Sequence, residues 1–201
     1  MIDSAILKDI NNIINGNLSD YDPVDSDSMS LMVIINLMGF EYGIELGTYY
    51  GFSSSMMLSY CPTIKKLYTI DKYQPYIDKI PPYIKVTKED SSFFKESSQK
   101  ILNSTYDHVK SKIETIVGDS LKVVHNFENE KYDFIFMDSH LSEDQLKSEL
   151  KTWYPKIKNG GVVCVHDTDQ KEIQKTVETF ISDKTISSNL GHFDNSTFWI
   201  K

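Results

Sequence analysis

Residues 45–53 read Glu-Leu-Gly-Thr-Tyr-Tyr-Gly-Phe-Ser and directly follow the short apolar run Tyr42–Ile44. This order predicts a strand that runs into a glycine turn and then into a helix. Gly47 and Gly51 let the backbone turn tightly and approach a ligand closely. Glu45 places a carboxylate beside this cradle, where a phosphate-binding turn would avoid one. The turn therefore favours a cationic or zwitterionic nucleoside over a nucleotide phosphate as its ligand.

The bulk composition is that of one folded domain. The chain has 201 residues, 40% of them hydrophobic and 25% charged, which is enough for a sizeable core. Its net charge of −8 and sequence pI of about 5.1 indicate an acidic surface. Such a surface repels phosphate backbones, so we expect no nucleic-acid partner.

Cysteine use and hydropathy predict the compartment. Cys61 and Cys164 lie in or beside apolar segments and are expected to be buried, reduced thiols. The N-terminus shows no basic region followed by an apolar core, and no run approaches the ~18 apolar residues of a membrane span. We therefore expect a soluble cytoplasmic protein without a membrane partner.

Apolar runs alternate with helical patterns along the chain, which indicates an α/β fold with a parallel sheet. Two extended segments near the C-terminus, Thr185–Ser188 and Thr197–Ile200, predict a terminal hairpin. The predicted strands are 42–46, Leu67–Ile70, Ile113–Val117, Tyr132–Met137 and Gly161–Val165. The predicted helices cover about residues 6–14, 28–38, 51–60, 120–128, 143–157 and 170–182.

We expect a single domain over residues 1–201 with two additions to the sheet. Residues 1–40 are predicted to form an N-terminal helical cap. The connection 72–112 is longer than a normal crossover; its first half is rich in proline and tyrosine, and its second half has a helical pattern. We interpret 72–112 as an insertion over the strand ends that helps to shape a pocket.

Four of the five predicted parallel strands end on or just before an acid: Asp71, Asp119, Asp138 and Asp167. In an open parallel sheet, ligands bind beyond the carboxyl ends of the strands, so these side chains are expected to share one site. The alternative for each acid is a helix N-cap. Four acids together with Glu45 favour the shared site.

The positions of two of these acids fit an adenine nucleoside. Asp71, 26 residues after Glu45, is placed to accept both hydroxyls of a ribose. The sequence Gly118-Asp119-Ser120 supplies side-chain acceptors suited to an adenine amine. The dinucleotide fingerprint Gly-x-Gly-x-x-Gly is absent, which argues against a NAD-dependent oxidoreductase.

These motifs resemble those of class I S-adenosylmethionine-dependent methyltransferases. Gly43–Ser54 resembles the first motif of the catechol O-methyltransferase family. Tyr132–Asp167 is similar to a bacterial group that includes macrolide-sugar O-methyltransferases and cephalosporin-hydroxylase-like proteins, whose members carry Asp-Gly-x-His and, later, His-Asp. Here the first element is one residue shorter, at Asp138–His140. The resemblance covers about residues 40–71 and 113–201.

The resemblance implies a Rossmann-like, doubly wound, mostly parallel seven-stranded sheet with helices on both faces and a C-terminal antiparallel hairpin. It also implies S-adenosyl-L-methionine as cofactor. Gly47, Tyr49 and Ser53 match positions that hold its methionine part, Asp71 matches the ribose acid, and Lys72 the residue against adenine. The cofactor-binding candidates are Glu45, Gly47, Thr48, Tyr49, Tyr50, Gly51, Ser53, Asp71, Lys72, Gly118, Asp119, Ser120 and Asp138.

A divalent metal is also implied by the resemblance. In catechol-type enzymes three oxygen ligands hold magnesium; Asp138 and Asp167 match two of them, and Thr168 falls where an asparagine is usual. With Asp169, these carboxylates offer hard oxygen ligands suited to Mg²⁺ or Mn²⁺. The alternative is that Asp138 contacts only the cofactor and its water.

The catalytic lysine of catechol enzymes has no match, since Ser142 stands near its place. The catalytic candidates are therefore Asp138, His140 and His166, with either imidazole as a base because it titrates near neutrality. The alternatives are a structural role for His140 and a helix-capping role for the His166-Asp167 pair.

The expected activity is methyl transfer to a hydroxyl of a small molecule, with a sugar preferred on resemblance. The Asn/Asp-Pro-Pro-aromatic motif of amide and base methyltransferases is missing after the fourth strand. Two alternatives remain: a cofactor-binding protein without transferase activity, and a methyltransferase acting on nitrogen or on a macromolecule. Oligomeric state stays open, with a homodimer as one hypothesis.

Overall fold

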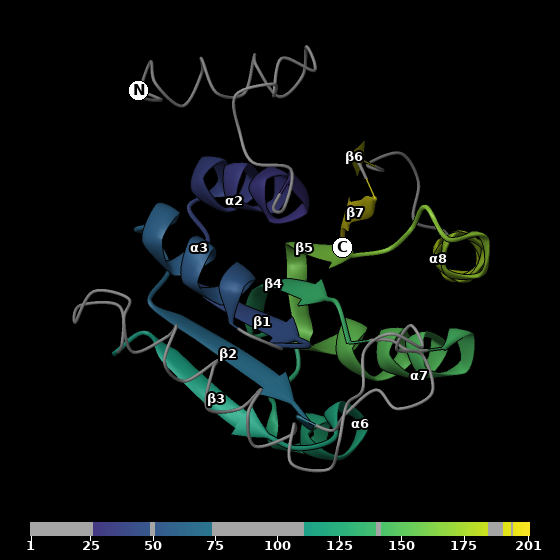
Figure 1. Cartoon of the computed structure of the whole chain (residues 1–201), viewed down its shortest axis with the longest axis horizontal. Coiled ribbons are helices and arrows are strands. Elements are labelled where there is room, and N and C mark those ends of the chain that lie inside the picture. Colours follow the sequence, from purple (N-terminus) through teal and green to yellow (C-terminus); the bar gives the residue numbers. More distant parts are fainter. Residues whose placement is uncertain (1–25, 49–50, 74–110, 140–141, 185–190, 194) are drawn as a thin grey trace, which may run out of the picture.

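The structure is a computed structural model that describes residues 26–48, 51–73, 111–139, 142–184, 191–193 and 195–201 (Figure 1). Several predictions lie outside these ranges. They are the helix at 6–14, most of the insertion 72–112, the extended segment Thr185–Ser188, and the side chains of Tyr49, Tyr50 and His140.

The centre of the fold is a seven-stranded sheet in the order β3-β2-β1-β4-β5-β7-β6. Strands β1 to β5 pair in parallel, and β7 runs antiparallel to both β5 and β6. This confirms the predicted Rossmann-like fold class. The strands are β1 Tyr42–Leu46, β2 Lys66–Asp71, β3 Ile113–Val117, β4 Tyr132–Met137, β5 Ile157–Val165, β6 Gly191–Phe193 and β7 Ser196–Ile200.

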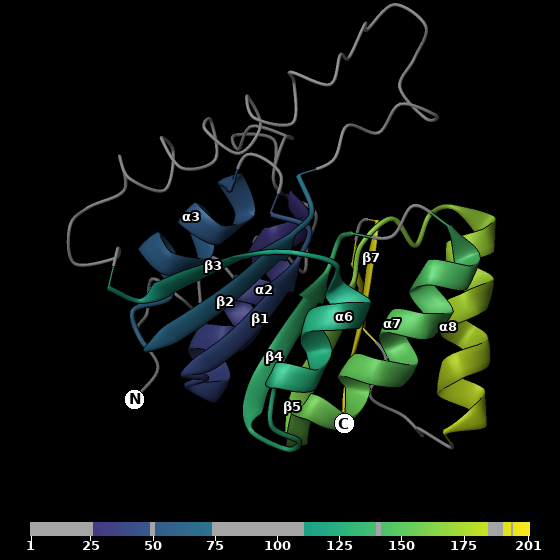
Figure 2. The ribbon, with the colours of Figure 1, turned by 90° about the horizontal axis from the view of Figure 1, so that it is seen from below.

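Helices cover both faces of the sheet (Figure 2). Helices α2 (Ser26–Met38) and α3 (Phe52–Tyr60) lie on one face; α6 (Ser120–Val123), α7 (Glu143–Trp153) and α8 (Lys171–Asp183) lie on the other.

Strand β4 shows how the apolar runs serve both layers. Phe134 and Phe136 join the core under α2 and α3, whereas Ile135 and Met137 join the core under α7 and α8. Successive side chains of a strand point to opposite faces, so a strand covered on both sides is largely apolar along its length.

The predicted start of β5 at Gly161 and the predicted end of the preceding helix at residue 157 are both wrong. Helix α7 ends at Trp153 and a 3₁₀ turn, Tyr154–Lys156, follows it. Pro155 lies in this turn, and its ring and missing N–H prevent the helix from continuing. Strand β5 then begins at Ile157, which pairs with Tyr132 of β4 before a register shift.

The other predicted helix past a strand end is also shorter than expected. The segment 120–128 consists of α6 and a 3₁₀ turn, Val124–Asn126.

The C-terminal hairpin is confirmed. Strand β7 covers the predicted segment Thr197–Ile200, and its partner is β6 at Gly191–Phe193. A Cβ at Gly191 would lie 2.0 Å from the Phe198 ring, so the pairing requires glycine there. Within the described ranges, no helix has the length and apolar character needed to cross a membrane.

Candidate functional site

The glycine turn lies where the strand order reverses, because the chain leaves β1 toward β2 and later returns to β4 on the other side. Gly47 has φ +90°, and a Cβ there would be 2.4 Å from the Asp138 carbonyl oxygen. Its N–H donates to the Ile70 carbonyl at 2.9 Å, and the Asp138 N–H donates to the Leu46 carbonyl at 2.8 Å. Glycine therefore lets the ends of β1, β2 and β4 meet. The region beyond the strand ends at such a switch point, here called the crevice, is the usual ligand site of an open α/β sheet.

Glu45 is fully buried beneath the turn. Its carboxylate accepts a hydrogen bond from the Ser53 hydroxyl at 2.5 Å and a second from the Ser54 hydroxyl. Burial raises the pKa of Glu45 to about 7, although the two serine hydroxyls lower it in part. These contacts join β1 to the first turn of α3, so Glu45 supports the turn from below.

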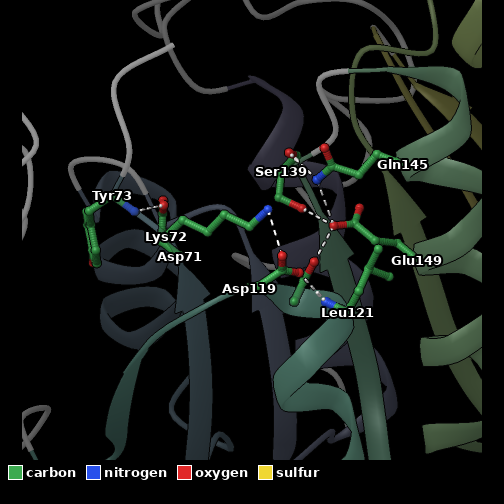
Figure 3. Close-up of polar contacts among 9 residues, drawn as sticks. Asp71, Lys72, Tyr73, Asp119, Leu121, Ser139, Gln145 and Glu149 are labelled. Atoms are coloured by element: carbon green, nitrogen blue, oxygen red, sulfur yellow. Dashed lines mark hydrogen bonds and ion pairs between the residues drawn. The ribbon is translucent and has the colours of Figure 1, made fainter.

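The ends of β2 and β3 carry Asp71 and Asp119. The Asp71 carboxylate accepts from the Tyr73 N–H at 2.7 Å, and Lys72 pairs with Asp119 at 3.0 Å (Figure 3). Asp119 also accepts from the Leu121 N–H at 2.9 Å, which caps α6. Burial acts to raise the pKa of Asp119, but the hydrogen bonds from Lys72 and Leu121 outweigh it and lower the pKa. Asp119 is therefore the N-cap of α6, and this role does not exclude a contact with a ligand.

Three side chains beyond β4 and β5 form a cluster that could hold a metal ion. Asp138, His166 and Asp167 each offer one ligand atom, all within 4.8 Å of one another. His166 Nδ1 lies 3.1 Å from an Asp138 oxygen and 3.3 Å from an Asp167 oxygen. Asp167 has φ +60°, a left-handed conformation that costs free energy in a residue other than glycine. Two carboxylates and an imidazole suit Mn²⁺, and the carboxylates suit Mg²⁺.

Thr168, expected as a metal ligand, makes other contacts. Its hydroxyl donates to the Asn195 carbonyl at 3.1 Å and accepts from the Thr197 hydroxyl at 2.8 Å. Only 1% of Thr168 is exposed, so it ties the end of β5 to the hairpin. Asp169 is exposed and is not part of the cluster. Among the described residues, the third member of the cluster is therefore His166, in place of Thr168 or Asp169.

Three further predicted residues, Thr48, Gly51 and Gly118, lie at the same edge of the sheet. Thr48 is buried in the turn, and Gly51 caps α3 with φ 76°. Gly118 donates its N–H to the Asp71 carbonyl at 2.9 Å, and this hydrogen bond joins the ends of β2 and β3. The structure thus brings the predicted acids to one edge of the sheet, as expected.

Sequence reasoning missed two polar residues near this edge. Asn195 Nδ2 lies 3.3 Å from His166 Nε2. Glu149 is fully buried and accepts hydrogen bonds from Ser120 and Ser139. A signal for Glu149 existed, because the acid stands within the apolar stripe of α7 beside Leu150, with Leu146 and Trp153 one turn away on either side.

Comparisons with known proteins agree with this arrangement. A family model described as a methyltransferase domain matches residues 44–168, which is more than half of the chain. No curated protein matches the sequence.

Solved structures share the fold at low sequence identity. The O-methyltransferase TomG from Streptomyces achromogenes, solved with S-adenosylmethionine, has 18% identity and a TM-score of 0.63; the match covers 100% of this chain and 90% of TomG. An O-methyltransferase from Bacillus cereus, solved with S-adenosylhomocysteine, has 13% identity and a TM-score of 0.63, with 100% and 92% covered. The O-methyltransferase NovP has 14% identity and a TM-score of 0.65, with 99% of each chain covered. The family match, on a sheet of this order with the glycine turn at its switch point, shows that the chain belongs to the class I S-adenosylmethionine-dependent methyltransferases.

Proposed function

We propose that the protein transfers the methyl group of S-adenosylmethionine to a hydroxyl of a small molecule, with a divalent metal held by Asp138, His166 and Asp167. The observation that carries this proposal is the position of the metal-type cluster. Asp138 belongs to the cluster, and its backbone carbonyl packs against Gly47 of the cofactor turn. The cofactor crevice and the cluster are therefore neighbours.

The chemistry needs little from the protein beyond positioning and proton removal. The cofactor's sulfonium is already activated, so an acceptor oxygen displaces the methyl group when it is aligned and deprotonated. A bound Mg²⁺ or Mn²⁺ would supply a lowered pKa for an acceptor hydroxyl and would orient it. We propose His140 as the base that takes the proton, because both ring nitrogens of His166 already face other groups.

The cofactor is proposed to lie along the strand ends. In this arrangement Gly47 and Ser53 hold the methionine part, Asp71 accepts the ribose hydroxyls, and Asp119 and Ser120 meet the adenine edge. Asp71 and Asp119 are the acids at the ends of neighbouring strands β2 and β3, and ligands of open α/β sheets bind across such strand ends. The other proposed cofactor contacts are Thr48, Tyr49, Tyr50, Gly51, Lys72, Gly118 and Asp138.

Oxygen as the acceptor atom is supported by the names of TomG and NovP, both O-methyltransferases. We propose a sugar hydroxyl as the substrate class. The N-terminal cap 1–40 and the insertion 72–112 are proposed to shape its pocket. A cytoplasmic location is proposed because Cys61 and Cys164 are both buried, as expected of structural thiols in a reducing compartment. A homodimer stays a hypothesis.

Calorimetry tests the cofactor part of the proposal. The purified chain is expected to bind S-adenosylmethionine and S-adenosylhomocysteine, and Asp71→Asn is expected to weaken both about 10–100-fold, because a charged acceptor of two hydroxyls is lost. Asp183→Asn, at the exposed end of α8, is the matched control and should bind normally. No binding by the unmutated chain would refute the proposal.

Transfer of a labelled methyl group to a panel of sugars and phenols then tests the activity. Labelled product with an O-methyl group supports the proposal. Cofactor binding without transfer to any acceptor would favour a binding protein, and an N-methyl product would favour a nitrogen acceptor.

A further inference from the structure

A buried carboxylate underlies the proposed adenine end of the crevice. Glu149, on α7, has no exposed surface. One of its oxygens, Oε1, accepts from the Ser120 hydroxyl at 2.6 Å, the Ser139 hydroxyl at 2.8 Å and the Gln145 amide at 3.0 Å. Figure 3 shows Ser139 and Gln145 converging on this oxygen. Burying a charged group is costly unless it is hydrogen-bonded, so the three donors explain how the carboxylate is tolerated.

Two of the donors come from the segments that follow strands β3 and β4. Ser120 directly follows Asp119, beyond β3, and Ser139 directly follows Asp138, beyond β4. Gln145 also donates to the Ser139 carbonyl at 3.0 Å. The other oxygen, Oε2, is buried and has no hydrogen-bond partner in the described part of the chain. Within that part, the hydrogen bonds of the carboxylate come from Gln145 of its own helix and from Ser120 and Ser139, the residues that follow Asp119 and Asp138.

In the structure both serine hydroxyls donate to Glu149 Oε1. A hydroxyl has a single proton, so the proton of each serine is engaged by Glu149. Each serine oxygen is then left with lone pairs alone. The neighbouring Asp119 is likewise an acceptor, and it already holds the Lys72 ammonium at 3.0 Å. With the Lys72 ammonium paired to Asp119, the two serine oxygens and the Asp119 carboxylate have lone pairs with which they can accept from a ligand.

We propose that Glu149 sets the specificity of the cofactor site for a purine that carries a 6-amino group. It acts as a positioning residue: it fixes the hydroxyl protons of Ser120 and Ser139 so that their oxygens accept from the amine. A purine with a carbonyl at this position is rejected, because its oxygen faces the serine oxygens and no proton is left for a hydrogen bond. This inference rests on the proposed function, since it assumes that an adenine nucleoside occupies the crevice.

The experiment compares two ligands by calorimetry: S-adenosylhomocysteine and its deaminated analogue S-inosylhomocysteine. The unmutated chain is expected to prefer the amine by at least about tenfold, the effect of one hydrogen bond made against one left unmade. In Glu149→Gln the amide can donate to the serines and release their protons, so the preference should fall about tenfold. Glu143→Gln, on the exposed first turn of the same helix, should keep the preference.

The outcomes distinguish failure of the proposed function from failure of the specificity role of Glu149. If the unmutated chain binds neither ligand, the proposed function is overturned, and this inference with it. If it binds both equally, or if Glu149→Gln weakens both by the same factor, only the specificity role is overturned, because a merely structural residue would act in that way. Should Glu149→Gln fail to fold by circular dichroism, Ser120→Ala and Ser139→Ala replace it. An unchanged preference in both serine variants would refute the inference.

Discussion

At the residue scale, Glu45 shows how a motif residue can serve the scaffold of a site. The acid was expected beside the ligand because it precedes the glycine turn. In the structure it is buried and holds Ser53 and Ser54 at the start of α3. Ser53 is itself a proposed contact of the methionine part, so Glu45 orients that residue from behind.

Burial of Glu45 predicts a pH dependence of stability. Its pKa is about 7 in the folded protein against an ordinary value of 4.5. The folded state therefore favours the protonated form. Relative to alkaline pH, protonation of Glu45 stabilises the folded protein by about 3 kcal/mol. This stabilisation is complete below about pH 4.5 and is lost as the pH rises through about 7. Urea unfolding from pH 4.5 to 8.5 should show that Glu45→Gln removes this part of the pH dependence.

The control for this measurement is Glu172→Gln, at an exposed position of α8. It should leave the pH profile of the unfolding free energy unchanged. A Glu45→Gln profile that runs parallel to that of the unmutated chain would show that Glu45 does not titrate in this window.

At the element scale, the turn between β1 and α3 depends on close approach to β4. Gly47 combines a positive φ with the nearby Asp138 carbonyl, at 2.4 Å from the place of a Cβ. Substitution therefore acts on both the turn and the segment that carries Asp138. The predicted strand–turn–helix unit was correct because its signals are local: an apolar run, two glycines and a helical pattern.

Gly47→Ala is expected to lower both stability and cofactor affinity. Gly160→Ala is a matched control, since Gly160 has a similar φ of +83° but nothing within 4 Å of a Cβ. The control should lose about 1 kcal/mol of unfolding free energy from backbone strain alone. Gly47→Ala should lose clearly more, as measured by urea unfolding, and should bind S-adenosylmethionine at least about tenfold more weakly. Equal losses of stability in the two variants would contradict the close approach to Asp138.

Other elements show where local patterns do not suffice. Strand β4 was predicted at its observed bounds, because all six residues pack against neighbours and the run is largely apolar. The first half of β5 was missed, since Lys158, Asn159 and Gly160 are polar or flexible. Strand β5 pairs with β4 at Ile157 and again from Val162 on, with a register shift between, and the Gly160 N–H donates to the Lys201 carbonyl at 2.7 Å. Hydrogen bonding to neighbours overrides their weak intrinsic preference for a strand.

At the scale of the whole molecule, the metal-type cluster exists only because the sheet places β4 next to β5. We expect Mn²⁺ to raise the melting temperature by binding the folded state alone, and EDTA to reverse the rise. Asp138→Asn and Asp167→Asn should abolish the shift, which calorimetry with Mn²⁺ would measure directly. EDTA should also abolish methyl transfer.

Thr168→Val is the control that separates the cluster from its surroundings. It removes a hydroxyl bonded to Asn195 and Thr197, so it should lower the melting temperature while keeping the response to Mn²⁺. Loss of that response in Thr168→Val would place Thr168 among the ligands. An unmutated chain that ignores both Mn²⁺ and EDTA would refute the metal site.

Three features are local patterns of neighbouring residues: the strand–helix alternation, the glycine turn and the acids after the strands. They were sufficient to predict an α/β fold with a parallel sheet, because backbone conformation and burial on two faces follow from neighbouring residues. The class of enzyme was predicted from the resemblance of these motifs to those of known methyltransferases. The partners of the side chains were decided by packing. His166 contacts Asp138, and Thr168 forms a hydrogen bond with the hairpin. Glu149 accepts hydrogen bonds from Ser120 and Ser139, which are 29 and 10 residues away in the sequence. Such contacts join residues distant in sequence, and only the order of the strands and the docking of the helices determine which of them meet.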